Sequence, residues 1–241
     1  MISVCILTKN SAATLGKTLD SVASFPEVLI YDNGSTDETL SIAAQYTNVV
    51  IHEGPFIGFG PLRNRAAELA RYDWILALDS DEVISPKLLH EIQEANLEAR
   101  CVYNLPRHNF YNGKRIWGCG WGGDRVVRLY NRKSTLYRLD AVHESVVTNG
   151  LQIVCLKYPL IHTPFRSTSE FLAKMQHYSS LYAQQNQGRK VSFSRAVMSG
   201  LYSFFRSYFL QKGFLLGREG FIISLYNANT TFYKYLKLSE R

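Results

Sequence analysis

Three carboxylates follow a short apolar run in the first half of the chain. The run reads Trp-Ile-Leu-Ala-Leu at positions 74–78, and Asp79, Asp81 and Glu82 stand directly after it. A continuous apolar run of this length is typical of a strand that is buried on both faces. Hard divalent cations such as Mg²⁺ and Mn²⁺ prefer oxygen ligands and keep positions open for phosphate oxygens. The Asp-x-Asp spacing therefore predicts a metal site for a nucleotide diphosphate, with the cap of a helix that starts at Ser85 as the alternative role for these acids.

The chain around these acids alternates between strand and helix patterns. Strands are expected at residues 2–8, 28–32, 49–51 and 74–78, and helices at 12–23, 37–46 and 62–70. This alternation predicts βαβ units and a mostly parallel sheet, whose ligands bind outside the carboxyl ends of the strands. We therefore expect the polar residues at three strand ends to meet in one crevice, namely Thr8, Lys9 and Asn10, then Asp32 and Asn33, then Asp79, Ser80 and Asp81.

Composition and cysteine spacing narrow the class of protein. The chain has 241 residues, of which 46% are apolar and 20% charged, and this is enough for one sizeable core. The four cysteines lie far apart without a Cys-x-x-Cys pair, so neither a zinc site nor a disulfide framework is indicated. The N-terminus enters an apolar strand at once, without the features of a secretory signal. These observations predict a cytoplasmic protein.

The net charge of +7 comes entirely from the C-terminal part of the chain. Residues 189–241 carry 9 Lys and Arg against 2 Asp and Glu, whereas residues 1–188 carry 18 of each kind. Charged residues interrupt every apolar stretch there, so a membrane-spanning helix is not expected. The segment either packs on the main domain or lies on an anionic membrane, and no nucleic-acid-binding motif accompanies it. Its predicted amphipathic helix has an apolar face made of Val197, Leu201, Phe204, Phe205, Tyr208 and Phe209, with Arg195 and Arg206 opposite.

Three motifs stand in a particular order and spacing along the chain. They read Val-Cys-Ile-Leu-Thr-Lys-Asn at 4–10, Tyr-Asp-Asn-Gly-Ser-Thr-Asp at 31–37 and Leu-Asp-Ser-Asp-Glu at 78–82. Together they resemble the motifs of glycosyltransferase family 2. The similarity runs nearly end to end, because residues 128–130, 142–144 and the tail from Phe193 resemble the short bacterial lipopolysaccharide-core glucosyltransferases of that family.

This resemblance implies a fold, a reaction and a location. The fold is the α/β GT-A fold, with a Rossmann-like, mostly parallel sheet and a C-terminal helical appendage. We expect a catalytic domain over residues 1–165, with a nucleotide-binding half (1–85) and an acceptor half (86–165), followed by a helical basic region (166–241). The implied reaction uses Mg²⁺ or Mn²⁺ and inverts the anomeric carbon. A hexose, expected to be glucose from UDP-glucose, moves to a lipopolysaccharide core or another lipid-linked oligosaccharide on the inner face of the cytoplasmic membrane.

Carried over residue by residue, the resemblance gives roles to the polar strand ends. Thr8 and Asn10 would line the nucleotide pocket. Asp32 would accept hydrogen bonds from the uracil or the ribose, with an ordinary Asp-Asn-Gly turn as its alternative role. Asp79 would lie near the ribose, and Asp81 would bind the metal.

Basic and histidine side chains supply further candidates. Arg63 follows the Gly-rich residues 58–60 and could reach a phosphate, although exposed helix arginines are usually solvated. Arg128 is expected to pair with an acid on the sheet. His143 and His162 are candidate metal ligands, because a neutral imidazole can complete a sphere begun by carboxylates, and a structural role is the alternative for each.

Inverting transfer needs a base that takes the proton of the acceptor hydroxyl. Asp124 follows a glycine- and tryptophan-rich stretch at 117–123, which predicts a flexible loop able to stack a sugar and to close over it. Glu144 is the rival candidate, in a short alternating segment at 142–146 that predicts a strand. We favour Asp124. The neighbours Gly123 and Arg125 do not supply the second acid that many relatives place beside the base.

Two other functions fit parts of the sequence. A non-catalytic nucleotide- or glycan-binding module would keep the fold without the chemistry. A nucleotidyltransferase would also have a sheet, a metal and acids, but the first loop lacks the Gly-rich phosphate clamp with Arg or Lys that such an enzyme favours.

Overall fold

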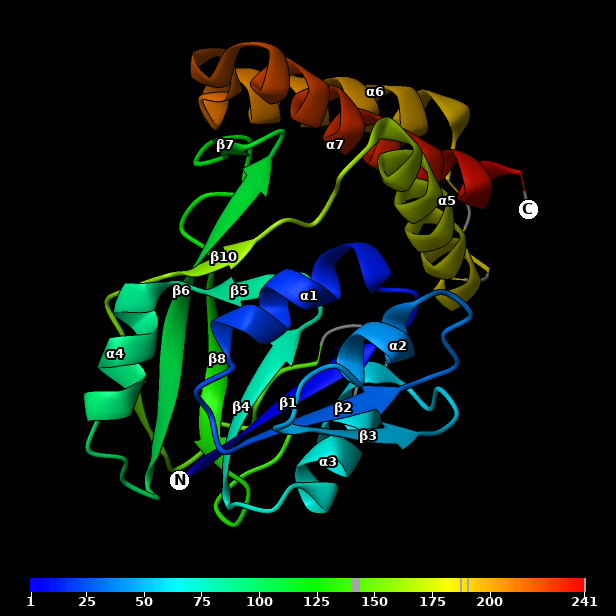
Figure 1. The fold of residues 1–241 in the computed structure, drawn as a ribbon. Helices are drawn as coiled ribbons and strands as arrows, with labels where there is room; N and C mark the ends of the chain where they lie inside the picture. The colour runs from blue at the N-terminus through cyan, green and yellow to red at the C-terminus, as the bar shows by residue number, and fades with distance from the viewer. Residues whose placement is uncertain (140–143, 187, 190, 241) are drawn as a thin grey trace. The chain divides into compact units, whose positions relative to one another are not determined.

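The computed structural model describes residues 1–139, 144–186, 188–189 and 191–240. The chain forms two compact units, which can be followed in Figure 1. Unit 1 consists of Met1–Arg107 and Asp124–His162, and unit 2 consists of His108–Gly123 and Thr163–Arg241. Each unit is therefore assembled from two separate stretches of the chain.

Unit 1 is built around a mixed β-sheet with a parallel half. The parallel strands are, in spatial order, β3 (Val49–Glu53), β2 (Glu27–Asp32), β1 (Ile2–Thr8) and β4 (Trp74–Asp79). The sheet continues through β8 (Arg125–Asn131), β6 (Cys101–Tyr111), β10 (Leu160–His162) and β5 (Glu82–Ile84), with β9 (Gln152–Cys155) also paired to β6. β8 runs antiparallel to both β4 and β6, and β10 runs antiparallel to β5. The predicted βαβ series and its parallel sheet are confirmed.

The parallel strands are buried because their apolar side chains alternate between two cores. On β1, Val4 and Ile6 belong to one core and Cys5 to the other. Helices α1 (Ala12–Ser21), α2 (Thr39–Ala43) and α4 (Pro86–Glu94) contribute to the first core, and α3 (Phe59–Leu69) contributes to the second. Helices therefore cover both faces of the sheet, and the carboxyl ends of its strands are the edge left for a ligand.

Several predicted boundaries differ from the structure. Helix α2 is shorter than the helix expected at 37–46, and helix α3 begins at Phe59 instead of residue 62. Gly58 turns the chain with φ of 104°, and Pro61 is tolerated in the first helical turn because the amide it lacks would have no partner there. The strand predicted at 142–146 is not formed by its described residues, of which only Val146 makes a bridge, with Tyr137.

Unit 2 combines a hairpin, a loop and a set of helices. The hairpin joins the end of β6 to β7 (Lys114–Arg115). The helical elements are α5 (Thr168–Gln185), α6 (Phe193–Phe205), the π-helical turn η1 (Arg206–Leu210), the 3₁₀ turn η2 (Gly213–Leu216) and α7 (Gly217–Ser239). The predicted C-terminal helices are therefore present.

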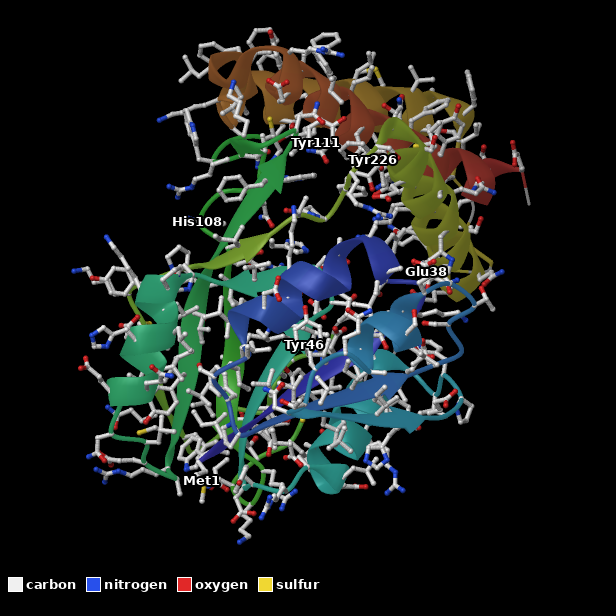
Figure 2. All side chains as sticks on the ribbon, in the orientation of Figure 1. Met1, Glu38, Tyr46, His108, Tyr111 and Tyr226 are labelled. Atoms are coloured by element: carbon white, nitrogen blue, oxygen red, sulfur yellow. The ribbon has the colours of Figure 1, made fainter. Side chains whose placement is uncertain are left out.

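The core of unit 2 joins the loop after the hairpin to the helices. Tyr111 and Tyr226, both labelled in Figure 2, come from β6 and α7 and each pack on Phe171 of α5. Trp121 stacks on Phe165, with their ring centroids 5.7 Å apart. The amide of Cys119 donates to the carbonyl of Gln211 at 2.9 Å. Part of the loop at 117–123 therefore packs on the helices of its own unit, and its ability to close over a sugar stays a prediction.

Candidate active site

Thr8 and Asp32 meet at the carboxyl ends of neighbouring parallel strands. They are register partners on β1 and β2, and the Thr8 hydroxyl donates to Asp32 Oδ2 at 2.8 Å. The same oxygen accepts from the Ser35 hydroxyl, and Oδ1 accepts from the amides of Gly34 and Ser35. Burial by itself would raise the pKa of Asp32, but these hydrogen bonds outweigh it and lower the pKa below its usual value. Asp32 thus orders the turn after β2, which is the alternative role that its sequence allowed.

The turns after β1 and β2 are joined to each other by side chains. The Asn10 amide donates to the Ser35 hydroxyl at 2.8 Å, and the Asn10 side-chain oxygen accepts from the Thr36 amide at 2.8 Å. Asn10 adopts a left-handed backbone conformation with φ of 51°, which asparagine tolerates better than most residues. The hydroxyls of Ser11 and Ser80 lie 2.8 Å apart and join this structure to the turn after β4. The three strand ends predicted to converge do so.

Asp79 lies between two arginines at the end of β4. Its Oδ1 accepts a hydrogen bond from Arg63 Nη2, and its Oδ2 accepts one from Arg128 Nη2, each at 2.5 Å. Both arginine side chains are buried, whereas the Asp79 side chain is 34% exposed. Burial favours the neutral acid, but the positive charges of Arg128 and Arg63 outweigh it and hold the pKa of Asp79 well below its usual range. The pairing of Arg128 with an acid is confirmed, and Arg63 is a buried partner of Asp79 rather than an exposed cation.

Glu82 is a fully buried carboxylate that joins Arg128 to one further arginine, Arg107. Its Oε1 accepts from Arg128 Nη2 at 2.8 Å and from Arg107 Nη1 at 3.2 Å, and its Oε2 accepts from the Asp79 amide at 3.0 Å. Arg107 also donates to Asp124 Oδ2 from Nε at 2.8 Å, and its Nη2 lies 2.6 Å from the same oxygen in an ion pair. The guanidinium group of Arg107 therefore holds Asp124, one of the two candidate bases, and also contacts the buried Glu82.

Glu144, the other candidate base, approaches the opposite end of the same set of charges. Its Oε1 lies 3.7 Å from Arg63 Nε, and its side chain is 22% exposed. Acids and arginines thus alternate without a break between the two candidates. The order of this charge chain is Asp124, Arg107, Glu82, Arg128, Asp79, Arg63 and Glu144.

Asp81 lies beside one of the two predicted histidine ligands. Its Oδ2 is 3.5 Å from Nε2 of His162, and both side chains are partly exposed. The antiparallel pairing of β5 with β10 brings them together, because it places His162 opposite Glu82. His143 lies outside the described residues. Among the described residues, no group of three or more acidic, histidine or cysteine side chains gathers as a metal site.

Comparison with known proteins assigns the chain to a family. The sequence profile described as Glycosyl transferase family 2 matches residues 3–152. An uncharacterized glycosyltransferase of Rickettsia felis is 30% identical over 99% of this chain and 89% of its own length. The chain belongs to glycosyltransferase family 2. The resemblance that the three motifs carried is thereby confirmed.

One further relative in sequence and two solved structures are also similar to this chain. The lipopolysaccharide core biosynthesis glycosyltransferase LpsC of Rhizobium meliloti is 27% identical over 100% of this chain and 92% of its own length. The mannosyltransferase PcManGT of Pyrobaculum calidifontis, solved with GDP-Man and Mn²⁺, has a TM-score of 0.54 and 14% identity, over 95% of this chain and 85% of that one. TarS of S. aureus with UDP-GlcNAc has a TM-score of 0.50 and 16% identity, over 99% and 90%. These structures show that the fold is GT-A.

Sequence reasoning gave no role to Glu82 or Arg107 of this glycosyltransferase. Glu82 was visible only as the third acid after β4, and Arg107 stands in no motif. Both acquire their positions from antiparallel pairing, of β5 with β10 and of β6 with β8. The sequence offered one signal. Three acids stand at or just after the end of β4, and any of them that is buried needs a positively charged partner.

Replacing Glu82 by Gln should lower the free energy of unfolding by about 2 kcal/mol. The amide keeps the size of the side chain but removes the negative charge that Arg107 and Arg128 share. Urea unfolding of the two proteins measures the difference. The matched control is Glu68→Gln, because Glu68 pairs with Arg65 on the exposed surface and should contribute about 0.5 kcal/mol or less. Equal losses in the two variants would mean that the buried charge contributes nothing to stability.

Proposed function

We propose that this glycosyltransferase inverts the anomeric carbon of a UDP-hexose, with glucose as the hexose, and acts on the lipopolysaccharide core or another lipid-linked oligosaccharide. The observation that carries the proposal is the Asp81–His162 pair beside the ionised Asp79, at the strand ends where α/β sheets bind ligands. The name of LpsC supports a lipopolysaccharide acceptor, and the UDP-GlcNAc held by TarS supports a UDP-sugar donor. The proposal places donor binding in residues 1–85 and acceptor selection in residues 86–165.

The donor site in this proposal is formed by the turns after β1, β2 and β4. Thr8 and Asn10 border the nucleotide, and Asp79 presents an ionised oxygen to the ribose. The carboxylate of Asp32 already accepts from four internal donors, so its contact with the uracil would replace one of them. Arg63 acts through Asp79, which it orients from the buried side.

The pair of Asp81 and His162 fits a divalent cation. One carboxylate oxygen and one imidazole nitrogen 3.5 Å apart are close to the spacing of about 3 Å expected for adjacent ligands of an octahedral ion bound at about 2.1 Å. Oxygen with nitrogen would suit Mn²⁺, an ion that also accepts oxygen ligands such as those of a diphosphate. PcManGT was solved with Mn²⁺, which supports a metal of this kind. When bound, the ion would neutralise the diphosphate that leaves.

The proposed base is Asp124. The acceptor hydroxyl oxygen attacks the anomeric carbon from the face opposite the diphosphate, so that a carbon–oxygen bond forms as the bond to the diphosphate breaks. The hydroxyl proton passes to the Asp124 carboxylate, and UDP departs with the bonding electrons. The hydrogen bond from Arg107 Nε and the ion-pair contact of Nη2 both reach Oδ2 of Asp124, which orients the carboxylate. Glu144 is the rival, at the Arg63 end of the charge chain.

The proposal is tested by turnover with a set of UDP-sugars, Mn²⁺ and a lipid-linked core oligosaccharide. We expect UDP release with UDP-glucose as the best donor, and a β-linked product in the anomeric proton coupling of its NMR spectrum. An α-linked product would contradict inversion. Release of pyrophosphate instead of UDP would indicate a nucleotidyltransferase, and donor binding without turnover on any acceptor would indicate a binding module.

A further inference from the structure

Large apolar side chains are exposed along one part of unit 2. They lie on α6, η1, η2 and the first turns of α7, within residues 193–225. No helix in the described part of the chain is long and apolar enough to cross a bilayer. We call these residues the apolar face of unit 2, and they are Phe193, Met198, Leu201, Tyr202, Phe205, Phe209, Leu210, Phe214, Leu215, Phe221 and Leu225.

These side chains are exposed although the helices already have packing partners. Gly200 allows α6 to approach α7 so closely that an added Cβ would lie 3.0 Å from Cβ of Phe232. Phe204 and Tyr208 are partly covered and pack on the ring of Phe221, with centroid distances of 5.7 and 5.8 Å. Packing of the helices within the protein therefore explains part of the predicted apolar face. The eleven residues of the apolar face remain exposed.

The exposed charges on the elements that carry the apolar face have one sign. Arg195, Arg206, Lys212 and Arg218 are exposed on the same elements. The only acid within residues 193–225 is Glu219, which is partly buried and lies 3.6 Å from Lys114 Nζ. Lys114 also donates to the carbonyl of Leu216 and so holds the β7 hairpin beside η2, where Figure 1 shows it at the end of the helices. The hairpin carries two more exposed groups, Arg115 and Trp117, of the kinds that favour a membrane interface.

We propose that the apolar face of unit 2 inserts into the interfacial region of an anionic phospholipid membrane. The exposed aromatic and leucine side chains would enter the boundary between head groups and acyl chains, while the surrounding cations pair with lipid phosphates. Charge argues against a second copy of this chain as the occupant, because pairing the face with itself would bring two sets of exposed cations together. The inference rests on the proposed function, in which the acceptor is anchored in a membrane.

The test is co-sedimentation of the full chain with phosphatidylcholine vesicles, prepared with and without phosphatidylglycerol. We expect binding only with phosphatidylglycerol, a loss of about fivefold in Phe209→Ser, and a loss of about fivefold for each cation removed in Arg206→Gln and Lys212→Gln. The matched control is Phe56→Ser in unit 1, because Phe56 and Phe209 are both 50% exposed. Circular dichroism confirms that each variant is folded.

Several results would overturn the proposal. These are equal binding to both kinds of vesicle, no binding by the wild type, equal losses in Phe209→Ser and Phe56→Ser, or a dimer in sedimentation velocity that Phe209→Ser converts to monomer. Calorimetric binding of UDP-glucose with Mn²⁺ separates this proposal from the enzymatic one. Phe209→Ser should keep donor binding, and Asp81→Ala should keep vesicle binding.

Discussion

Asp81→Asn is expected to abolish the stimulation of donor binding by Mn²⁺ and to lower kcat/KM about a thousandfold, or about 4 kcal/mol. Asn keeps the shape of the side chain but removes the negative charge that a divalent cation needs. In the proposed site Asp81 and His162 would be the ligands that the described residues give to the metal, so the change would leave only His162. Calorimetry with UDP-glucose, with and without Mn²⁺, measures the first effect, and initial rates measure the second.

The control for this result is Asp73→Asn. It makes the same chemical change at a carboxylate that pairs with Lys133 and Arg132 near the surface. Donor binding and its dependence on Mn²⁺ should be unchanged there. If Asp81→Asn retains a response to Mn²⁺ of the wild-type size, the metal does not bind at this strand end and the proposed site is wrong.

Asp124→Asn is expected to lower kcat by about 10²–10⁴-fold, the range associated with loss of a general base. Donor affinity should stay the same, because the base acts on the acceptor hydroxyl and not on the nucleotide. Glu144→Gln, made separately, should lower kcat by less. Its carboxylate lies 3.7 Å from Arg63, the partner of Asp79, so we expect its main effect on the binding of donor. Single-turnover rates and calorimetric donor affinities on both variants provide the comparison.

Each substitution neutralises a carboxylate that pairs with an arginine, and this can lower stability. Thermal unfolding of both variants must therefore be measured alongside the kinetics. A folded Asp124→Asn variant with normal turnover, beside a folded Glu144→Gln variant that binds donor and does not turn over, would transfer the role of base to Glu144. The two variants can be compared directly, because each candidate base pairs with an arginine at one end of the same charge chain.

The parallel half of the sheet could be predicted because its information is local. Each strand is a short apolar run that ends in a polar residue, and parallel strands in βαβ units must bring those ends to one edge. The meeting of Thr8 with Asp32 follows from this rule alone. The structure brings His162, one of the two candidate histidines, within 3.5 Å of Asp81, and metal binding by this pair stays a prediction.

The rest of the site depends on antiparallel partners that are distant in sequence. The pairing of β6 with β8 sets Arg107 against Asp124, and a register error of one residue would point these side chains to opposite faces. No periodic pattern encodes that register. The exposure of the apolar face could not be predicted from the sequence either. An amphipathic pattern identifies an apolar face of a helix but does not show what covers that face. The packing of the loop at 117–123 was not foreseen, because glycines that permit close packing look the same in sequence as glycines that permit motion.

The discontinuity of unit 2 limits how this protein can be recombined with its relatives. The core of the unit takes Tyr111, Ile116 and Cys119 from a stretch that interrupts unit 1, and takes Leu216 and Ile223 from the C-terminal helices. Gly213 fits because an added Cβ would come within 2.9 Å of the Cys119 sulfur. A helical segment grafted at residue 163 from another family 2 enzyme would arrive without the loop that matches it. The two stretches must be inherited, or engineered, as a set.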